Sequence, residues 1–181
     1  MKKLFFALCS IRLIPAYLLY KASKNRAIIT ADVIQNEKQM KRPGAGFFGL
    51  MRDFNQFRNI VYYRLGPVRH LVGWICPDNP SIEILTANVG PGLCIRHASG
   101  CVIGGIIGKN LTIFQNATVG GELNGGYPTI GDNVTIRPGA MVCGAIKIGD
   151  NCVIGAMSYI NKNVPANTII HPKQELVSKM I

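Results

Sequence analysis

A glycine-rich stretch in the middle of the chain contains the residue best suited to acid–base chemistry, His97. Residues 90–100 read GPGLCIRHASG, so His97 directly follows Arg96. An imidazole can take up a proton near neutral pH, which lets it activate a hydroxyl group that attacks a carbonyl carbon. From the residue type alone, an ordinary histidine at a surface corner is the alternative.

A second stretch with an unusual composition follows the first within the same half of the chain. Residues 120–128 read GGELNGGYP, and four glycines with one proline in nine residues predict a loop that leaves the regular structure. Tyr127, near the end of this loop, could stack on a sugar ring or could simply support the loop.

The element that must position these residues is indicated by a period of six. From about Ser81, aliphatic residues recur every sixth position, with small or apolar residues four positions later and glycines or Asp-Asn pairs at the intended corners. Three short strands make one triangular turn of a solenoid, and neighbouring turns bury each other's apolar stacks. At about 18 residues per turn we expect four to five turns. The repeating positions are Ile107, Ile113 and Val119, then Ile130, Ile136, Val142, Ile148, Ile154 and Ile160.

The first part of the chain lacks this period and reads as helical. Residues 47–65 predict one amphipathic helix, because Phe54, Phe57, Val61 and Leu65 recur at helical spacing. We therefore expect a mainly helical N-terminal region over residues 1–80 and a mainly β domain over residues 81–181.

The charge of the chain is concentrated in the helical region. The net charge is +11, and residues 1–80 hold thirteen Lys and Arg against four Asp and Glu. No nucleic-acid-binding motif accompanies this charge, so nucleic acid is the least favoured partner. The apolar run of residues 4–20 is interrupted by Arg12 and predicts a helix that either lies on the inner membrane or packs on protein. The six cysteines form no CxxC pair, which favours a reducing, cytoplasmic compartment.

The six-residue period resembles the left-handed parallel β-helix of the hexapeptide-repeat acyltransferases, and the handedness is implied by that resemblance. Residues 89–100, 113–121 and 139–140 are similar to the catalytic coils of serine acetyltransferases. The resemblance covers roughly residues 82–173, and the family also includes acetyltransferases of polysaccharide biosynthesis. Residues 57–64 resemble that polysaccharide branch more weakly.

The resemblance implies roles for particular residues in an acetyl-CoA-dependent reaction. His97 would be the general base and Glu83 the acid that orients it, with backbone N–H groups near Gly121 facing the developing oxyanion. It also implies a homotrimer with each site between two subunits. The residues implied to contact acetyl-CoA are Gly121, Pro138, Ala156 and Lys173, and no metal is implied, because a carbonic anhydrase of this fold needs three histidines whereas His97 is alone within the repeats.

Two positions differ from the serine-specific pattern of the family. Serine acetyltransferases have an aspartate before the histidine and an Arg-His pair before the loop proline, whereas this chain has Arg96, and Gly126 with Tyr127. A cation at Arg96 would repel the ammonium group of serine. The sequence therefore predicts a sugar or polysaccharide-precursor hydroxyl as acceptor, with Arg96 and Tyr127 in contact with it. A divergent serine acetyltransferase and a non-catalytic assembly protein are the alternatives.

Overall fold

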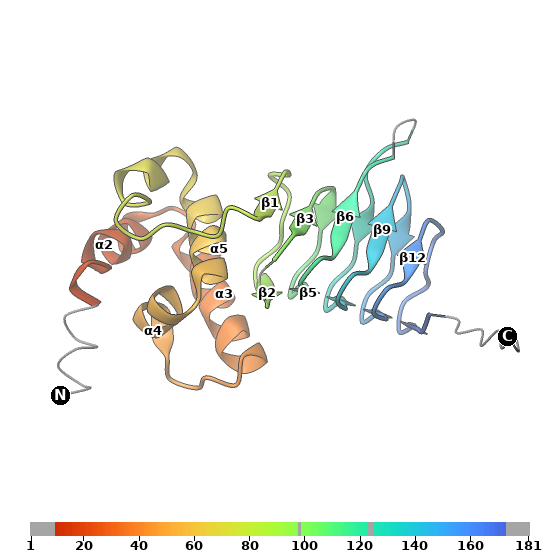
Figure 1. Ribbon diagram of the computed structural model, residues 1–181, viewed down its shortest axis with the longest axis horizontal. Coiled ribbons are helices and arrows are strands. Elements are labelled where there is room, and N and C mark those ends of the chain that lie inside the picture. The colour runs from red at the N-terminus through yellow and green to blue at the C-terminus, as the bar shows by residue number, and fades with distance from the viewer. Residues whose placement is uncertain (1–9, 98, 123–124, 173–181) are drawn as a thin grey trace, which may run out of the picture.

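The computed structural model describes residues 10–97, 99–122 and 125–172, and it consists of a helical part followed by a β-helical part along one long axis (Figure 1). The last helical turn ends at Leu71 and the first strand begins at Ile82. The division into domains at residue 80 stays a prediction, because buried residues of both parts form one continuous apolar cluster.

The β-helical part has three sheets in which every strand pair is parallel. The strands of one sheet come from successive turns of the coil, and two of the three sheets have five strands, so the predicted four to five turns are confirmed at five. The first sheet holds β1 (Ile82–Ile84), β3 (Cys101–Ile103), β6 (Thr118–Gly120), β9 (Met141–Cys143) and β12 (Tyr159–Ile160). The second holds β4 (Ile106–Ile107), β7 (Thr129–Ile130) and β10 (Lys147–Ile148). The third holds β2 (Cys94–Arg96), β5 (Thr112–Phe114), β8 (Thr135–Ile136), β11 (Val153–Ile154) and β13 (Ile169–Ile170).

The predicted six-residue register is confirmed by burial. All nine repeating aliphatic residues from Ile107 to Ile160 are at most 8% exposed, and they stack on their counterparts in neighbouring turns. Two- and three-residue strands cannot be stable singly, so the stacking of these apolar side chains holds the coil together.

The corners between the second and third sheets use asparagine where the backbone must adopt a positive φ. Asn110, Asn133, Asn151 and Asn167 have φ between 57° and 59°. Their side-chain amides form a ladder, in which each Nδ2 donates to the Oδ1 of the next turn at 2.9 to 3.0 Å. Asparagine tolerates the left-handed region, and its amide gives each turn a second link to the next.

Replacing Asn133 separates these two contributions. Asn133→Gly and Asn133→Ala both remove the bonds to Asn110 and Asn151, but only alanine must hold its Cβ at positive φ. We expect the alanine variant to be less stable than the glycine variant by about 1 kcal/mol in urea unfolding. An alanine variant as stable as the glycine variant would show that this corner relaxes without strain.

The helical part differs from the sequence prediction in one place. The single helix expected over residues 47–65 is wrong, because the chain is extended at Phe54 (φ −130°, ψ 104°) and divides it into two helices. Arg58 stabilises the break, since its guanidinium donates to the carbonyls of Met51 (2.6 Å) and Arg52 (3.0 Å) that the first helix leaves free. The elements are α2 (Ile14–Ala22), α3 (Arg26–Gln39), α4 (Gly46–Asp53), α5 (Asn55–Leu65) and the 3₁₀ turn η1 (Gly66–Leu71).

A buried ion pair joins the helices to the first turn of the β-helix. Arg64 of α5 donates to the carboxylate of Asp32 of α3 at 2.9 Å, and both side chains are at most 4% exposed. Arg64 also donates to the carbonyls of Val89 and Gly90. Asp32 in turn accepts the N–H groups of Gly92 (2.7 Å) and Leu93 (2.8 Å). The pair therefore satisfies backbone groups at the end of the coil, where an unpaired edge would otherwise remain.

No helix in the described ranges is long and apolar enough to cross a membrane. The predicted helix of residues 4–20 falls partly on residues 1–9, outside the described residues, and its remainder includes the start of α2.

Candidate active site

His97 lies at the corner where the third sheet leads into the first, which we call the histidine edge. In the described residues this edge comprises 96–97, 99–100, 114–117, 137–140, 155–158 and 171–172. The later turns of this edge connect their inward residues in six positions, as from Ile113 to Val119. The first turn needs eight, from Ile95 to Ile103. The corner that holds His97 is therefore two residues longer than the later corners of this edge.

The backbone holds His97 in a conformation that is unusual for its residue type. Its φ is +52° and its side chain is exposed. The imidazole ring lies 6.2 Å from the ring centre of Phe114 in the next turn. A strained, exposed corner histidine that contacts no carboxylate in the described part of the chain is available to a ligand.

Phe114 is also contacted by two guanidinium groups. The Cζ atoms of Arg96 and Arg137 each lie 5.3 Å from its ring centre, at positions that the strand register places on either side of it. Phe114 and Arg137 were missed by the sequence analysis. Phe114 could have been found by counting one turn forward from Arg96. Arg137 could have been found by counting one more turn and adding the length of the inserted loop.

The predicted partner of His97, Glu83, lies on the first sheet and not at the corner itself. It is an exposed residue of β1, and its register partner in the next turn is Val102. No hydrogen bond joins Glu83 to His97 among the described residues, so its orienting role stays a prediction.

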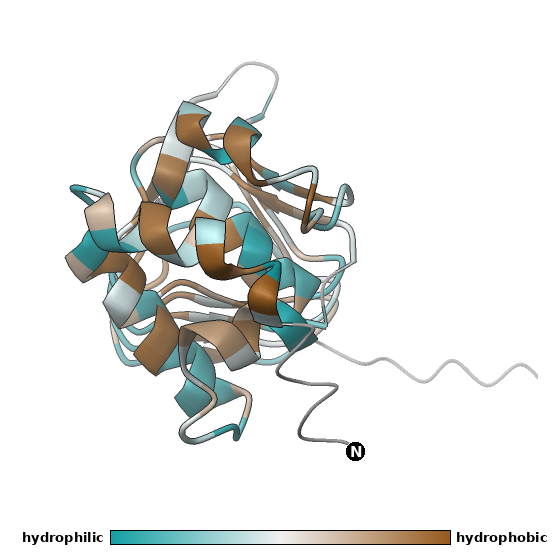
Figure 2. Cartoon of the chain, turned by 90° about the vertical axis from the view of Figure 1, so that its left-hand side faces the viewer, coloured by the Kyte–Doolittle hydropathy of each residue, from teal (hydrophilic) through white to brown (hydrophobic). Residues whose placement is uncertain are grey.

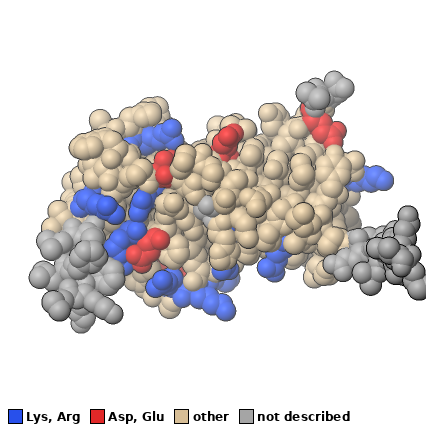
Figure 3. Space-filling model, in the orientation of Figure 1, with Lys and Arg blue, Asp and Glu red and all other residues tan. Residues whose placement is uncertain are grey.

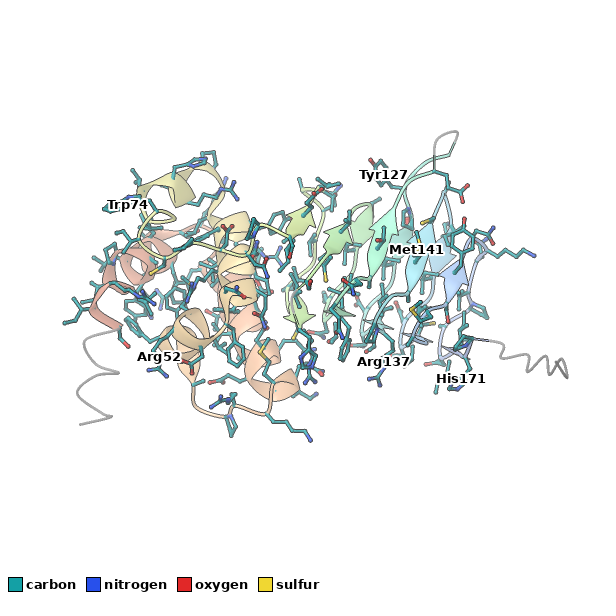
Figure 4. The ribbon with its side chains drawn as sticks, viewed as in Figure 1. Arg52, Trp74, Tyr127, Arg137, Met141 and His171 are labelled. Atoms are coloured by element: carbon teal, nitrogen blue, oxygen red, sulfur yellow. The ribbon has the colours of Figure 1, made fainter. Side chains whose placement is uncertain are left out.

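The remaining predicted site residues divide between two edges of the first sheet. Pro138 and Ala156 share the histidine edge with His97 and Arg96, whereas Gly121 and Tyr127 lie at the opposite edge, where the first sheet leads into the second (Figure 4). In Figure 4, Tyr127 is at the upper edge, Arg137 and His171 are at the lower edge, and Met141 is on the face between them. Lys173 lies outside the described residues.

Residues 120–122 and 125–128 of the predicted loop lie at this second edge, and we call this edge the loop edge. They leave the coil there, as predicted (Figure 1). Tyr127 covers Gly104, since a Cβ added there would meet the tyrosine ring at 3.0 Å. The Tyr159 hydroxyl donates to Glu122 Oε1 at 2.9 Å, and this bond raises the pKa of Tyr159. Tyr127 is still 59% exposed, so it supports the loop and also presents a ring face to solvent.

The described cysteines offer no reactive thiolate near His97. Cys94, two residues before Arg96, is fully buried, and desolvation raises the pKa of its thiol to about 12. A thiol protonated at neutral pH inside the coil acts as a small apolar side chain. The five described cysteines are all buried free thiols.

Comparison with known proteins places this geometry in a class. A family model described as "Bacterial transferase hexapeptide (six repeats)" matches residues 127–162. Serine acetyltransferase of Staphylococcus aureus is 45% identical over 89 residues, which are 46% of this chain and 42% of the relative. The match thus spans less than half of the curated relative's length.

Solved structures extend the similarity over more of the chain. Serine acetyltransferase 1 of Entamoeba histolytica, in complex with L-cysteine, gives a TM-score of 0.68 at 26% identity and covers 90% of this chain and 69% of that one. The Neisseria gonorrhoeae serine acetyltransferase in complex with serine gives 0.64 at 26% identity, with 89% and 73% covered.

The fold and the repeats together define a left-handed parallel β-helix of the hexapeptide-repeat class, preceded by a helical region. Within that class, the chain is similar to serine acetyltransferases, over 46% of its length in the curated relative and over 89% in the Neisseria gonorrhoeae structure. The relatives described above are serine acetyltransferases, so the polysaccharide branch stays a prediction.

Proposed function

We propose that this protein is an acetyl-CoA-dependent O-acetyltransferase that uses His97 as its general base. The observation that carries the proposal is the exposed imidazole at a lengthened corner of a serine acetyltransferase-like coil. The imidazole removes the proton of an acceptor hydroxyl as its oxygen attacks the thioester carbonyl carbon. The carbon–sulfur bond then breaks, and the leaving thiolate of CoA takes the proton from the imidazolium. The acetyl ester and free CoA are the products.

The donor is proposed to lie along the histidine edge. Pro138 and Ala156 follow one another on successive turns of this edge, and their short side chains leave room for an extended pantetheine arm. Gly121 belongs to the opposite edge of the same chain, so it can reach the donor of a neighbouring copy only. Lys173 remains a proposed contact of a CoA phosphate.

We propose that the protein is a homotrimer, an arrangement that would bring the two edges of neighbouring copies together. His97 and Tyr127 lie at opposite edges of the first sheet, and a single chain does not bring them together. If the loop edge of one copy packs against the histidine edge of the next, Gly121 and Tyr127 come to face His97. Three copies close such a head-to-tail contact into a ring. Sedimentation equilibrium should give a mass three times the 19.7 kDa of the chain. A monomer would remove this part of the proposal.

The acceptor has two candidates that rest on different observations. The names of the relatives favour L-serine, the acceptor we had taken as the alternative. Arg96 beside His97 favours an acidic sugar or a polysaccharide precursor, because this cation repels an ammonium group. The similarity between chains supports serine better, and the sugar acceptor rests on Arg96 and Tyr127 alone.

Thiol release from acetyl-CoA tests the proposal and chooses between the acceptors. Purified protein is incubated with acetyl-CoA and either L-serine, neutral sugars or acidic sugars, and free CoA is measured with a thiol reagent. We expect acceptor-dependent CoA release. Release with serine alone removes the sugar acceptor, and no release with any acceptor favours the non-catalytic assembly protein.

We also propose that the helical end of the molecule contacts an anionic membrane surface. Large apolar side chains are exposed on α2 and on the segment around η1. Hydrophobic segments of the helical part face the viewer in Figure 2, and Lys and Arg side chains gather over the helical part in Figure 3. Apolar groups with cations around them suit the boundary of an anionic bilayer. The exposed apolar residues are Ile14, Leu18, Val68, Leu71 and Trp74.

Trp74 reports on this contact directly, because it is the only tryptophan and is 79% exposed. We expect its fluorescence emission to shift to shorter wavelength with phosphatidylglycerol vesicles and to stay unchanged with phosphatidylcholine vesicles. Leu18→Glu should weaken the shift, whereas Ile106→Glu, an exposed position on the β-helix, should not. An unchanged emission with both vesicles would remove the membrane contact.

A further inference from the structure

A column of three side chains runs along the histidine edge from successive turns. Arg96 ends β2, Phe114 ends β5, and Arg137 directly follows β8. The register pairs Arg96 with Phe114, and the pairing of Ile113 with Ile136 puts Arg137 beside Phe114 on its other side. The phenylalanine ring therefore separates two guanidinium groups.

The ring holds both guanidinium groups in defined positions. Each Cζ atom lies 5.3 Å from the ring centre, so the two are at most about 11 Å apart, which is twice that distance. A guanidinium that lies over an aromatic ring loses little freedom on binding and keeps its N–H groups for a ligand. Arg96 and Arg137 are thus prepared for bidentate bonds to an anion.

No acidic side chain among the described residues neutralises the charge of the two arginines. Neither forms an ion pair within the described residues. The described corners of the histidine edge contain no Asp or Glu, and their ionisable residues are Arg96, His97, Arg137 and His171. By contrast, the corner between the second and third sheets carries Asp132 and Asp150. The edge that holds His97 therefore carries cationic side chains with no acidic side chain among its described residues, which attracts anions to it.

The closeness of this site to His97 indicates that the bound anion is part of the acceptor that carries the reacting hydroxyl. Phe114 contacts the imidazole ring as well as the two guanidinium groups, at 6.2 Å between ring centres. A ligand whose hydroxyl reaches His97 would therefore lie beside the ring that also contacts Arg96 and Arg137, where a charged group of the same ligand can meet one of the two guanidinium groups.

We propose that Arg96 and Arg137, held apart by Phe114, form an anion-binding site for a carboxylate or phosphate group of the hydroxyl acceptor. This inference rests on the proposed acetyltransferase function. It requires that the acceptor carry a negatively charged group. Serine and an acidic sugar both meet it, so the inference does not depend on which of them is the acceptor. The same chemistry could come from the phosphates of CoA, and the experiment separates the two sources.

Direct binding tests the site without any turnover. Ligand-observed NMR compares D-glucuronate with D-glucose, and L-serine with L-serine methyl ester, so that each pair differs in its carboxylate. Inorganic phosphate is the simplest probe and is followed by calorimetry. We expect the two carboxylates and phosphate to bind wild-type protein, and the neutral sugar and the ester to bind much more weakly.

Matched variants assign the binding to the arginines. Arg96→Gln and Arg137→Gln should each weaken binding of the anions about tenfold. Arg42→Gln is the control, because Arg42 is an exposed guanidinium over the ring of Phe54 at 5.9 Å in the helical part. It should leave binding unchanged. Phe114→Leu keeps an apolar residue at the position and should weaken anion binding while the melting temperature changes little.

Kinetics then separate acceptor from donor. If acetyl transfer occurs, Arg137→Gln should raise the KM of the charged acceptor about tenfold and leave the KM of acetyl-CoA unchanged. An equal rise in the KM of acetyl-CoA, or variants that bind CoA itself less well, would overturn the inference in favour of the donor phosphates. Absence of anion binding to wild-type protein would overturn it outright. Anion binding without acetyl transfer would leave the site standing and remove the proposed function.

Discussion

Replacement of His97 by asparagine is expected to lower kcat by about 10²- to 10⁴-fold while the protein stays folded. Asparagine tolerates the positive φ of +52° at this corner and cannot act as a base near neutral pH. Because the side chain is exposed, its loss removes no buried contact. The measurement is the rate of CoA release at saturating acetyl-CoA and acceptor, together with the melting temperature of the variant.

A histidine at the other end of the same edge provides the control. His171→Asn changes an exposed imidazole four turns away and should leave kcat within about twofold of wild type. A His97→Asn variant that retains the wild-type rate would show that another group is the base. An equal loss of kcat in both variants would show that the histidines act through the charge of this edge and not through proton transfer.

Removal of the buried ion pair is expected to have the largest effect on stability. Asp32→Ala should lower the free energy of unfolding by about 3–5 kcal/mol, because Arg64 is then left as an uncompensated buried charge. The amides of Gly92 and Leu93 lose their acceptor in the same variant. Burial raises the pKa of Asp32, against the opposing bonds from Arg64 and the two amides. Urea unfolding followed by circular dichroism measures the loss.

An exposed ion pair of the same kind is the control for this variant. Arg52 and Asp53 lie 2.7 Å apart with side chains 24% and 30% exposed, so Asp53→Ala should cost at most about 1 kcal/mol. Replacing both buried partners, in Asp32→Leu with Arg64→Met, should cost less than the sum of the single changes, since no lone charge remains. Additive losses would mean that the two residues stabilise the joint independently.

The β-helix could be predicted from the sequence because its order is local. The aliphatic residues recur every sixth position, and each corner asparagine stands at a fixed spacing from the aliphatic residue before it. The loop of residues 120–128 was visible for the same reason, as the place where the period stops. Burial of the repeating positions then confirmed the register without exception.

Features that depend on distant residues were not predictable in this way. The break at Phe54 was missed for a different reason: Arg58 lies nearby in the sequence, but the carbonyls that it binds become free only when the helix ends. The burial of Arg64 depends on Asp32, 32 residues earlier. The placement of Arg96 and Tyr127 at opposite edges required the path of the whole coil.

The turns of the coil are unequal in length at the loop edge, so this edge accommodates connections of different sizes. Inward residues are four positions apart at the loop edge from Ile103 to Ile107, eleven from Val119 to Ile130 and six from Val142 to Ile148. The strands before and after each turn remain paired throughout. Segments can thus be inserted or deleted at this edge without disturbing the stack. The paired strands are the part of the scaffold that must be inherited unchanged, and the connections at the loop edge are the part that is free to diversify.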